Sequence, residues 1–450
     1  MGRLFGTDGV RGKANEALTA EVALDVAVAA AHVLAELGEF RGHTPFAVVG
    51  RDPRASGEFL EAAVVAGLAS AGVNVVRLGI VPTPGVAFLT ADSGADLGVM
   101  LSASHNPMPD NGIKFFARGG NKLDDELENA IEARIGESWA RPTGAGVGRV
   151  TVDEHRVEDY ISHLVNSLGR PVSLEGLKVV VDCANGAAYV AAPAAFEAQG
   201  AEVVRIHATP DGLNINENCG STHMDSLRSA VLAEHADIGI ALDGDADRCL
   251  AVDAAGRIVD GDQILAILAI AMHESGGLKN DTVVATVMSN LGFVQAMQAA
   301  GLTVEQTKVG DRYVLEAMRV GGFSLGGEQS GHVVLSEHAT TGDGVLTALQ
   351  LMSRMAEKRA SLAELASIMH RLPQVLINVP GVDKSRADTD QALLAAVAAA
   401  EEQLGRSGRV LLRPSGTESL VRVMVEAETY ESANEVATRL ADVVKSSLSL

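Results

Sequence analysis

Short apolar strands alternate with helix-length segments through most of the chain, and no other feature restricts the fold as much. The pattern fills about the first 135 residues, where FAVVG and GVML are strands. It recurs around LKVVVDCANG and IGIAL, and again around DTVVATV and FSL. Strands separated by helices pair in parallel, because parallel strands need a crossover connection. The recurrence predicts an α/β fold of three similar sandwich domains with mixed or parallel sheets.

The last part of the chain has a different order of elements. QVLINVPG, a helix over residues 390–404, GRVLLRPSGTES, LVRVMVEAE and a final helix indicate a smaller α+β domain with an antiparallel strand pair. A chain of 450 residues also exceeds the ~250–300 residues of a single core. With RPTGAGVGR as a linker, the predicted domains are 1–140, 155–255, 256–368 and 373–450, arranged around a central cleft.

Capping residues predict several helix ends. We expect Thr19 to cap a helix that stops at Gly38, and Ser56 to cap the following helix. Further helices are expected over residues 187–199 and from Asn290.

Composition indicates which kinds of partner and which cellular compartment to expect. A net charge of −22 argues against nucleic acid as the main partner, because clustered Lys and Arg bind phosphate backbones. Three widely spaced cysteines form no C-x-x-C pair, which favours reduced thiols in the cytoplasm. The opening MGRLFGTDGVRG lacks the apolar run of a signal peptide, and charged residues interrupt the long apolar segment near residue 30. We therefore expect no membrane segment and a cytoplasmic protein.

Each predicted domain has a polar loop directly after an apolar strand. These loops are SASHNP, DGDADR, GGEQSGH and RPSGTE, in chain order. Ligands of parallel α/β sheets bind beyond the carboxyl ends of the strands. Four such loops together predict one site built where the domains meet.

DGDADR places three carboxylates, Asp243, Asp245 and Asp247, at alternate positions. On an extended backbone this spacing directs them to one side, where they would repel one another without a cation. Oxygen ligands suit Mg²⁺ or Ca²⁺. An EF-hand is excluded, because that loop needs Gly and Glu where Arg248 and Ala254 stand. The alternative is a solvated acidic turn, which the apolar IGIAL before it disfavours.

RPSGTE has the composition of a phosphate-binding loop. Gly416 permits close backbone approach, and Ser415 and Thr417 offer hydroxyl groups. Arg413 and Arg422 add guanidinium groups that suit phosphate oxygens. A plain β-turn is the alternative, because Pro-Ser-Gly also favours turns.

GGEQSGH places Glu328, Ser330 and His332 at alternate positions. The carboxylate and the hydroxyl could bind sugar hydroxyl groups, and the imidazole could act as an acid or base or bind phosphate.

Ser104 and His105 are neighbours, so on an extended segment their side chains point apart and form no nucleophile–base pair. A serine near a cation and a phosphate-binding loop can instead carry a phosphoryl group itself. Lys114 and Arg11 could stabilise the charge during transfer, and Lys114 could also act as an acid or base.

These four loops, in this order, resemble the motifs of the α-D-phosphohexomutase family, and FGTDGVRG resembles its N-terminus. The resemblance covers essentially the whole chain. It is closest to the bacterial glucosamine-type members, because Gln329 stands where the mannose/glucose type usually has Met. Ala246 departs from the Gly of many relatives.

The resemblance implies a cytoplasmic enzyme that interconverts glucosamine 6-phosphate and glucosamine 1-phosphate, for UDP-N-acetylglucosamine and peptidoglycan precursors. It implies a phosphoserine, one Mg²⁺ ion and a bisphosphorylated sugar as activator or intermediate, and leaves a homodimer open. The implied metal ligands are Ser104, through its phosphoryl group, and Asp243, Asp245 and Asp247. The implied catalytic residues are Ser104, Lys114, His332, Arg11, His105 and Arg248. The implied substrate-binding residues are Glu328, Ser330, Lys308, Arg413, Ser415, Gly416, Thr417 and Arg422.

Three alternatives stay open from the residues. The chain could be a phosphomannomutase/phosphoglucomutase, or a metal-dependent phosphatase with Asp243 as nucleophile. It could also be a phosphosugar-binding protein without catalysis, although such a protein needs no acidic triplet beside a serine loop.

Overall fold

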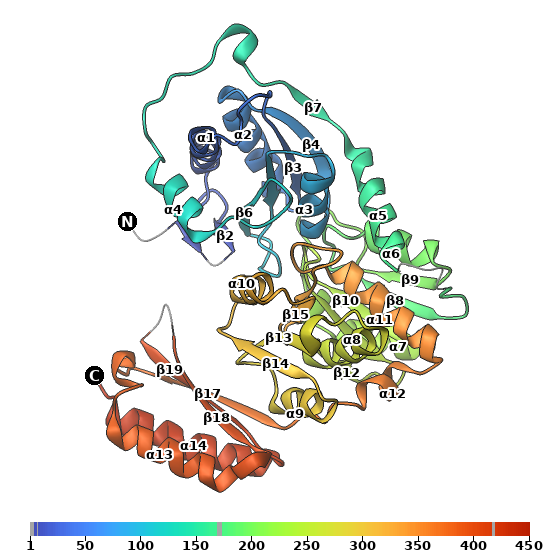
Figure 1. The fold of residues 1–450 in the computed structure, drawn as a ribbon, viewed down its shortest axis with the longest axis vertical. Helices are drawn as coiled ribbons and strands as arrows, with labels where there is room; N and C mark the ends of the chain where they lie inside the picture. Colours follow the sequence, from blue (N-terminus) through green and yellow to red (C-terminus); the bar gives the residue numbers. More distant parts are fainter. Residues whose placement is uncertain (1–3, 7, 169–172, 416–418) are drawn as a thin grey trace. The chain divides into compact units, whose positions relative to one another are not determined.

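The computed structural model describes residues 4–6, 8–168, 173–415 and 419–450. The chain divides into two compact units, the first with Met1–Met288 and Leu302–Ile368, the second with Ser289–Gly301 and Met369–Leu450. Figure 1 labels their helices and most of their strands. No helix of the described residues is both long and apolar enough to cross a membrane.

The first sheet of unit 1 has seven strands in the order β1-β2-β6-β5-β3-β4-β7. Its strands are β1 (Phe5–Gly6), β2 (Gly9–Lys13), β3 (Phe46–Arg51), β4 (Asn74–Ile80), β5 (Leu97–Leu101), β6 (Asp110–Ala117) and β7 (Val150–Val152). Its helices are α1 (Ala20–Leu37), α2 (Ser56–Ser70), α3 (Thr83–Asp92) and α4 (Asp125–Ala133). Apolar residues of α1 and α2 pack in one core and those of α3 in another, so the sheet is covered on both faces.

The second sheet has the order β12-β11-β10-β8-β9 and the third the order β14-β13-β15-β16. The second consists of β8 (Lys178–Asp182), β9 (Glu202–Ile206), β10 (Ile238–Leu242), β11 (Cys249–Asp253) and β12 (Ile258–Val259), with α5 (Val157–Asn166), α6 (Ala191–Ala198) and α7 (Asp225–Glu234). The third consists of β13 (Thr282–Thr286), β14 (Thr303–Thr307), β15 (Leu325–Gly327) and β16 (Val333–Leu335), with α8 (Gly261–Ser275), α10 (Asp311–Gly321), α11 (Gly344–Lys358) and α12 (Leu362–Ala366). Both sheets mix parallel and antiparallel pairs, so the predicted fold class is confirmed.

Unit 2 contains an antiparallel sheet in the order β17-β19-β18. Its strands are β17 (Gln374–Pro380), β18 (Arg409–Pro414) and β19 (Leu420–Glu426), and its helices are α9 (Leu291–Ala299), α13 (Gln391–Leu404) and α14 (Tyr430–Ser447). The helix from Asn290 therefore belongs to unit 2, although it follows a strand of the third sheet. The buried Glu426 explains this, because it accepts hydrogen bonds from Asn290 Nδ2 at 3.0 Å and Leu291 N at 2.9 Å.

The predicted caps of α1 are confirmed. Thr19 accepts from Val22 N, and Gly38 ends the helix with a φ of 88°. The predicted cap of α2 is wrong, since Ser56 is the first helical residue and Ala55 precedes it. Ser56 Oγ accepts instead from Asn111 Nδ2 at 2.9 Å, a tertiary contact with β6.

The helix expected over residues 187–199 is shorter than predicted, since α6 spans Ala191–Ala198. Ala184 and Asn185 before it have positive φ angles of 55° and 45°, and Gly186 N donates to Cys183 O. A turn of this kind delays the start of the helix.

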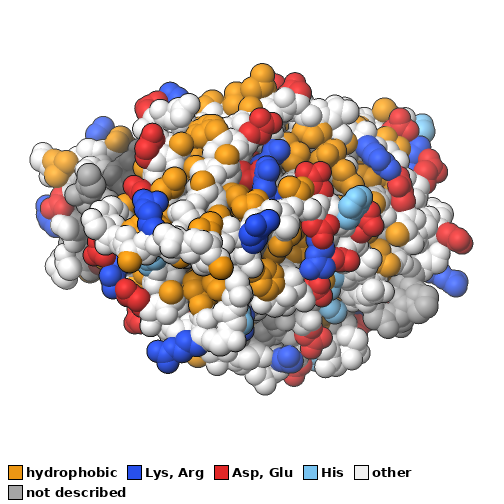
Figure 2. Space-filling model, turned by 90° about the horizontal axis from the view of Figure 1, so that it is seen from above, with side chains coloured by type: hydrophobic (Ala, Val, Ile, Leu, Met, Phe, Trp, Pro, Cys, Tyr) orange, Lys and Arg blue, Asp and Glu red, His pale blue; other side chains and the backbone are white. Residues whose placement is uncertain are grey.

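Trp139 is the only tryptophan of the chain and lies just before Arg141, where the predicted linker begins. Its ring contacts His32 of α1 edge-on at 4.3 Å between centroids. The Arg141 guanidinium lies 4.7 Å from its centroid. On the face seen in Figure 2, acidic and basic side chains are interspersed, and the basic ones form no continuous stripe there.

Candidate active site

The acidic loop connects β10 to its antiparallel neighbour β11. Asp243, Asp245 and Asp247 are buried, and one carboxylate oxygen of each lies within 4.8 Å of the other two. The extended backbone expected here is wrong, because Ala246 has a φ of 58° and the chain reverses. A tight turn therefore gathers the three carboxylates.

The serine loop follows β5 and ends against the acidic loop. Ser104 has a φ of 53°, a left-handed conformation that non-glycine residues rarely adopt. Its side chain is buried, and its Oγ donates to Asp243 Oδ2 at 2.5 Å. The predicted serine and the acidic triplet therefore meet although they are 139 positions apart.

His105 Nδ1 lies 3.4 Å from Ser104 Oγ, so the expectation that these side chains point apart is wrong. It assumed an extended segment, whereas Ser104 is left-handed. Burial, reinforced by Arg248 and Arg11, lowers the pKa of His105 to about 4. The imidazole is therefore neutral at neutral pH.

Lys114 lies on β6 with its ammonium among three carboxylates. Its Nζ is 2.8 Å from Asp245 Oδ2, 2.8 Å from Asp8 Oδ2 and 3.5 Å from Asp247 Oδ2. Burial alone would lower the pKa of Lys114, but Asp245 and Asp8 outweigh it and raise this pKa well above its ordinary value. Lys114 is therefore protonated and can act as a cation or a proton donor.

Asp8, Lys122 and Asp311 join this site without having been predicted. Arg11 of β2 pairs with Asp8, whose other oxygen lies 2.6 Å from Lys122 Nζ. Lys122 also pairs with Asp311 at the start of α10, which links the first and third sheets. Asp8 stands inside the motif FGTDGVRG, so its place there was the available signal.

The three loop carboxylates have different electrostatic surroundings. Burial, then repulsion from Asp247 and Asp245, raises the pKa of Asp243 well above its ordinary value. Burial also opposes the ionisation of Asp245, but the Lys114 ammonium outweighs it and lowers the pKa of Asp245. The Lys114 ammonium therefore balances the negative charge of Asp245. The cationic groups near Asp243 do not balance its negative charge, because its pKa stays raised.

The sugar-loop candidates follow β15. Glu328 Oε1 accepts from Gly310 N at 3.1 Å. Gln329 Nε2 donates to Asp262 Oδ2 at 3.0 Å, which ties the loop to the first turn of α8. His332 is buried, and its Nε2 is 3.8 Å from Asp311 Oδ2, too far for a hydrogen bond. Lys308 lies over the Tyr313 ring, 5.9 Å from its centroid.

Arg248 lies at the end of the acidic loop. Its backbone N donates to Asp243 Oδ1 at 3.2 Å, and its Nε is 3.8 Å from Asp247 Oδ1. Burial would lower the pKa of Arg248, but Asp243 and Asp247 raise it.

Several buried polar atoms at these loops have no hydrogen-bond partner among the described residues. They are Arg11 Nε, Asp245 Oδ1, Asp247 Oδ1, Arg248 Nε, Ser330 Oγ and both ring nitrogens of His332. Buried polar atoms are nearly always paired, so this concentration indicates the position of a bound group. The acidic oxygens and Ser104 Oγ are hard ligands at one point, which fits a Mg²⁺ ion.

Unit 2 carries the predicted phosphate-binding residues. Arg413 of β18 and Arg422 of β19 face each other as direct cross-strand partners. Burial, then the positive charge of Arg422, lowers the pKa of Arg413. Lys384 Nζ, which was not predicted, donates to Ser415 O at 2.6 Å. Gly416 and Thr417 lie outside the described residues.

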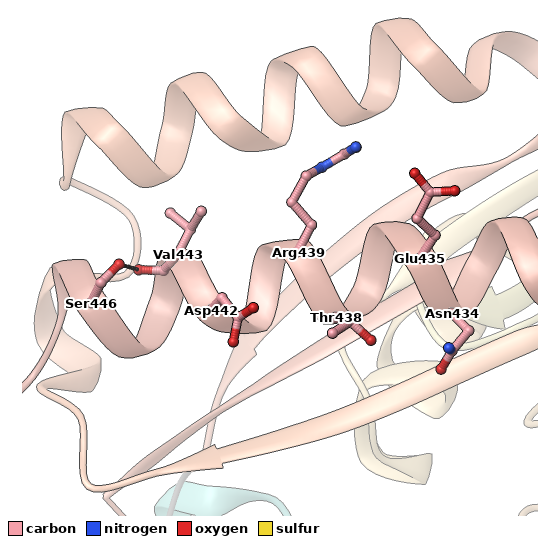
Figure 3. A pocket seen from close by; sticks show the side chains of 7 residues that line it. All are labelled: Asn434, Glu435, Thr438, Arg439, Asp442, Val443 and Ser446. Carbon is pink, nitrogen blue, oxygen red and sulfur yellow. Dashed lines mark hydrogen bonds between the residues drawn. The ribbon is translucent and has the colours of Figure 1, made fainter.

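A shallow hollow on α14 contains none of the predicted site residues. It is lined by Asn434, Glu435, Thr438, Arg439, Asp442, Val443 and Ser446. Figure 3 shows Arg439 and Glu435 on one side of the helix, and Arg439 Nη2 donates to Gln403 Oε1 of α13 at 2.6 Å. The hollow therefore reflects the packing of two helices.

Comparison with known proteins supplies the family. Family models of the phosphoglucomutase/phosphomannomutase α/β/α domains I, II and III match residues 2–141, 158–256 and 260–372, and the C-terminal domain matches residues 376–443. The chain belongs to the α-D-phosphohexomutase family, whose members are phosphosugar mutases.

Two curated relatives cover the whole chain and are covered completely by it. They are phosphoglucosamine mutases of Nocardioides sp. and Streptomyces griseus, 69% and 67% identical over 450 and 453 residues. Among solved structures, a phosphoglucomutase/phosphomannomutase family protein of Burkholderia thailandensis matches with a TM-score of 0.81 and 24% identity, over 99% of this chain and 97% of its own. Aspergillus fumigatus N-acetylphosphoglucosamine mutase, solved with GlcNAc-6P and magnesium, matches with a TM-score of 0.70 and 19% identity, over 99% and 96%.

Proposed function

We propose that this chain is a phosphoglucosamine mutase that interconverts glucosamine 6-phosphate and glucosamine 1-phosphate. Full-length relatives of that name, 69% and 67% identical, support the reaction and the amino sugar. The observation that carries the chemistry is the left-handed Ser104, whose hydroxyl lies 2.5 Å from Asp243 inside the acidic cluster.

Ser104 carries the phosphoryl group in this proposal. The free hydroxyl of the sugar phosphate attacks the phosphorus of phosphoserine, and the P–O bond to Ser104 breaks. The hydroxyl proton goes to a base of the protein, and the serine oxygen takes a proton from a donor. The product is a sugar bisphosphate, which returns its other phosphoryl group to Ser104 after it has turned over in the site.

The described residues suit these roles. His332 is buried, and neither of its ring nitrogens has a hydrogen bond to a described residue, which suits a base that receives the sugar proton. Lys114 and Arg11 hold positive charge next to the serine loop. Glu328 and Ser330 would contact sugar hydroxyls, His105 and Arg248 would border the phosphoryl group, and Lys308 would bind substrate.

Mg²⁺ would be held by Asp243, Asp245, Asp247 and an oxygen on Ser104. When bound, it would neutralise the phosphoryl group and polarise the leaving oxygen. The raised pKa of Asp243 supports this assignment, because a cation is needed to keep all three carboxylates ionised.

Arg413, Arg422, Ser415, Gly416 and Thr417 would hold the phosphate that does not react. The cross-strand pairing of two arginines supports this role, because like charges that face each other are stabilised by an anion. A homodimer and a cytoplasmic location stay predictions. In the cell the product would serve UDP-N-acetylglucosamine and peptidoglycan precursor synthesis.

The test compares initial rates with glucosamine, glucose and mannose 6-phosphates, in the presence of Mg²⁺ and a trace of bisphosphate. Formation of the 1-phosphates is followed by phosphorus NMR. We expect a strong preference for the amino sugar. Equal or faster turnover of glucose or mannose would instead support the phosphomannomutase/phosphoglucomutase alternative.

Ser104→Gly is the matched variant for the carrier, because glycine keeps the left-handed backbone without strain and removes only the hydroxymethyl group. Mutase turnover should be lost while the protein stays folded. Sustained turnover in this variant would sink the phosphoserine mechanism. Steady release of inorganic phosphate by it would favour a phosphatase with Asp243 as nucleophile, and no turnover by the wild type would favour a binding protein.

A further inference from the structure

Arg54, between β3 and α2, is a completely buried arginine whose role the sequence did not suggest. A guanidinium group has five N–H donors in a planar fork. All five are used here, because Nε donates to Asp52 Oδ2 at 2.9 Å and each terminal nitrogen donates to two carbonyl oxygens. Such complete use indicates that the surrounding backbone is built around this side chain.

The four carbonyl oxygens all belong to the serine loop and the start of β6. Arg54 Nη2 binds Ser104 O at 3.0 Å and Asn106 O at 2.9 Å. Arg54 Nη1 binds Pro107 O at 2.5 Å and Asp110 O at 3.0 Å. One side chain therefore pairs four carbonyl groups within seven residues, and these groups would otherwise be costly to bury.

The backbone N–H of Ser104 is also held by hydrogen bonds that lead back to Arg54. Ser104 N donates to Ser102 Oγ at 2.9 Å, and Ser102 Oγ donates to Asp52 Oδ2 at 2.6 Å, the oxygen that also accepts from Arg54. Both peptide groups that flank Ser104 are thus held, one directly by Arg54 and one through Asp52.

The side-chain amide of Asn216, in the loop between β9 and α7, also contacts the serine loop. Asn216 Nδ2 donates to Ser104 O at 2.8 Å and to Asn106 O at 3.1 Å, the same two oxygens that Arg54 Nη2 binds. Asn216 itself has a φ of 58° and is buried. Its contacts join the serine loop to the domain that carries the acidic loop.

We propose that Arg54 is a positioning residue for phosphoryl transfer, which keeps Ser104 in its left-handed conformation so that Oγ faces the acidic loop. This proposal rests on Ser104 as the phosphoryl carrier. A left-handed serine is strained by ~1–3 kcal/mol, so it persists only where other contacts overdetermine it. The fork of Arg54 supplies those contacts, and Asn216 reinforces them.

The test variant is Arg54→Lys. Lysine keeps a positive charge beside the buried Asp52 but replaces the planar fork by one ammonium group, which cannot pair with five acceptors. We expect kcat to fall about 10- to 100-fold while KM stays within about threefold, because the reacting oxygen is misplaced and the substrate contacts remain. Phosphoryl transfer from phosphorylated enzyme in a single turnover should slow by the same factor.

Phosphorus NMR reports the surroundings of the phosphoserine, and a change in the overall stability of the protein alone does not alter this signal. The phosphoserine resonance of the Arg54→Lys protein should shift or broaden relative to the wild type. Asn216→Gly, which keeps the left-handed backbone and removes the amide, should lower kcat by a smaller factor in the same direction. An unchanged resonance together with a kcat within twofold of the wild type would overturn the proposal.

Arg354→Lys is the matched control. Arg354 of α11 is also buried, and it pairs with Glu274 at 2.7 Å, away from the serine loop. The Arg354→Lys protein should have a lower free energy of unfolding, as the Arg54→Lys protein does, but its kcat should stay at the wild-type value. If both variants lose kcat in proportion to their stability, Arg54 has only a structural role and the proposal is wrong. Activity in Ser104→Gly would defeat the carrier assignment independently of Arg54.

Discussion

In the proposed function, the serine loop of unit 1 and the arginine strands of unit 2 bind phosphate groups in different ways. Ser104 is buried. Its N–H donates to the hydroxyl of Ser102, and its carbonyl oxygen accepts from Arg54 of the same domain and from Asn216 of the next domain. Arg413 and Arg422 instead face each other on two neighbouring strands and are half-buried. The first region fixes one oxygen atom, whereas the second concentrates positive charge.

This difference matches what each task needs. Bond breaking requires that reacting atoms be held within a fraction of an ångström, so many directional contacts converge on Ser104. Retaining a phosphate that does not react needs mainly charge and donors, which two guanidinium groups supply. Substitutions in the first region should therefore act on kcat, and substitutions in the second on KM.

The largest effect is expected from Asp243→Asn. The amide keeps the size of the side chain but removes one negative charge from the cation site, so kcat/KM should fall by roughly 10³-fold. Because burial and repulsion raise the pKa of Asp243, its neutralisation should also raise the unfolding free energy at pH 7 in metal-free buffer. Calorimetric Mg²⁺ titration, kinetics and denaturant unfolding measure these effects. A loss of stability would contradict the electrostatic reading of the acidic loop.

A smaller effect is expected from Arg422→Met, with a KM increase of about 10- to 100-fold and kcat within about threefold. The substitution removes one of the two guanidinium groups proposed to hold the phosphate that does not react, and it also relieves their mutual repulsion. Steady-state kinetics give both constants. Arg439→Met, on the exposed face of α14, is the control and should leave both unchanged. A pure kcat effect at Arg422 would remove the contrast between the two regions.

A pH-dependent effect of intermediate size is expected at Asp343, a buried carboxyl group of unit 1. Asp343 caps α11 by accepting from Leu346 N at 2.9 Å, and it also accepts from Tyr160 OH at 2.9 Å. Burial raises its pKa from 3.8 to about 6. Between these pH values the folded state binds more protons than the unfolded state, so stability falls as pH rises.

The loss should total about 3 kcal/mol between about pH 3 and pH 7 and then level off. Asp343→Asn keeps the capping oxygen and should lack this part of the pH dependence. Denaturant unfolding of both proteins across that range is the measurement. Parallel curves for the two proteins would show that Asp343 has no raised pKa.

The smallest effect is expected from Ala246→Gly. Ala246 has a φ of 58° in the acidic loop, where glycine is free of strain. The unfolding free energy should rise by up to ~1 kcal/mol, with kcat and Mg²⁺ affinity within about twofold. A clear loss of activity would indicate that the alanine methyl group positions the carboxylates, as Arg54 positions the serine loop.

Much of the fold and the four loops could be predicted, because apolar strands and the polar loops after them are local in the sequence. Asp8 could have been found from its place in FGTDGVRG. Lys122, Arg54 and Asn216 could not be predicted, because each acts through partners far along the chain. The left-handed Ser104 also could not be predicted, since local preference disfavours that conformation outside glycine.

Ser56 shows the same limit at a helix end. Its type and position favour a cap, yet Asn111 of β6 binds its hydroxyl and Ala55 takes the capping position. A tertiary contact thus overrides a local preference, and the sequence around Ser56 carries no trace of it.

The position of Trp139 makes its fluorescence a probe of the contact between α1 and the segment before the linker. The only indole contacts His32 of α1 and lies beside Arg141 at the start of the linker. Burial lowers the pKa of His32, so this neighbour is uncharged at neutral pH and becomes a charged quencher of fluorescence in acid. Intrinsic fluorescence will therefore report on the contact between Trp139 and α1, and a signal for substrate binding needs a fluorophore placed near the serine loop.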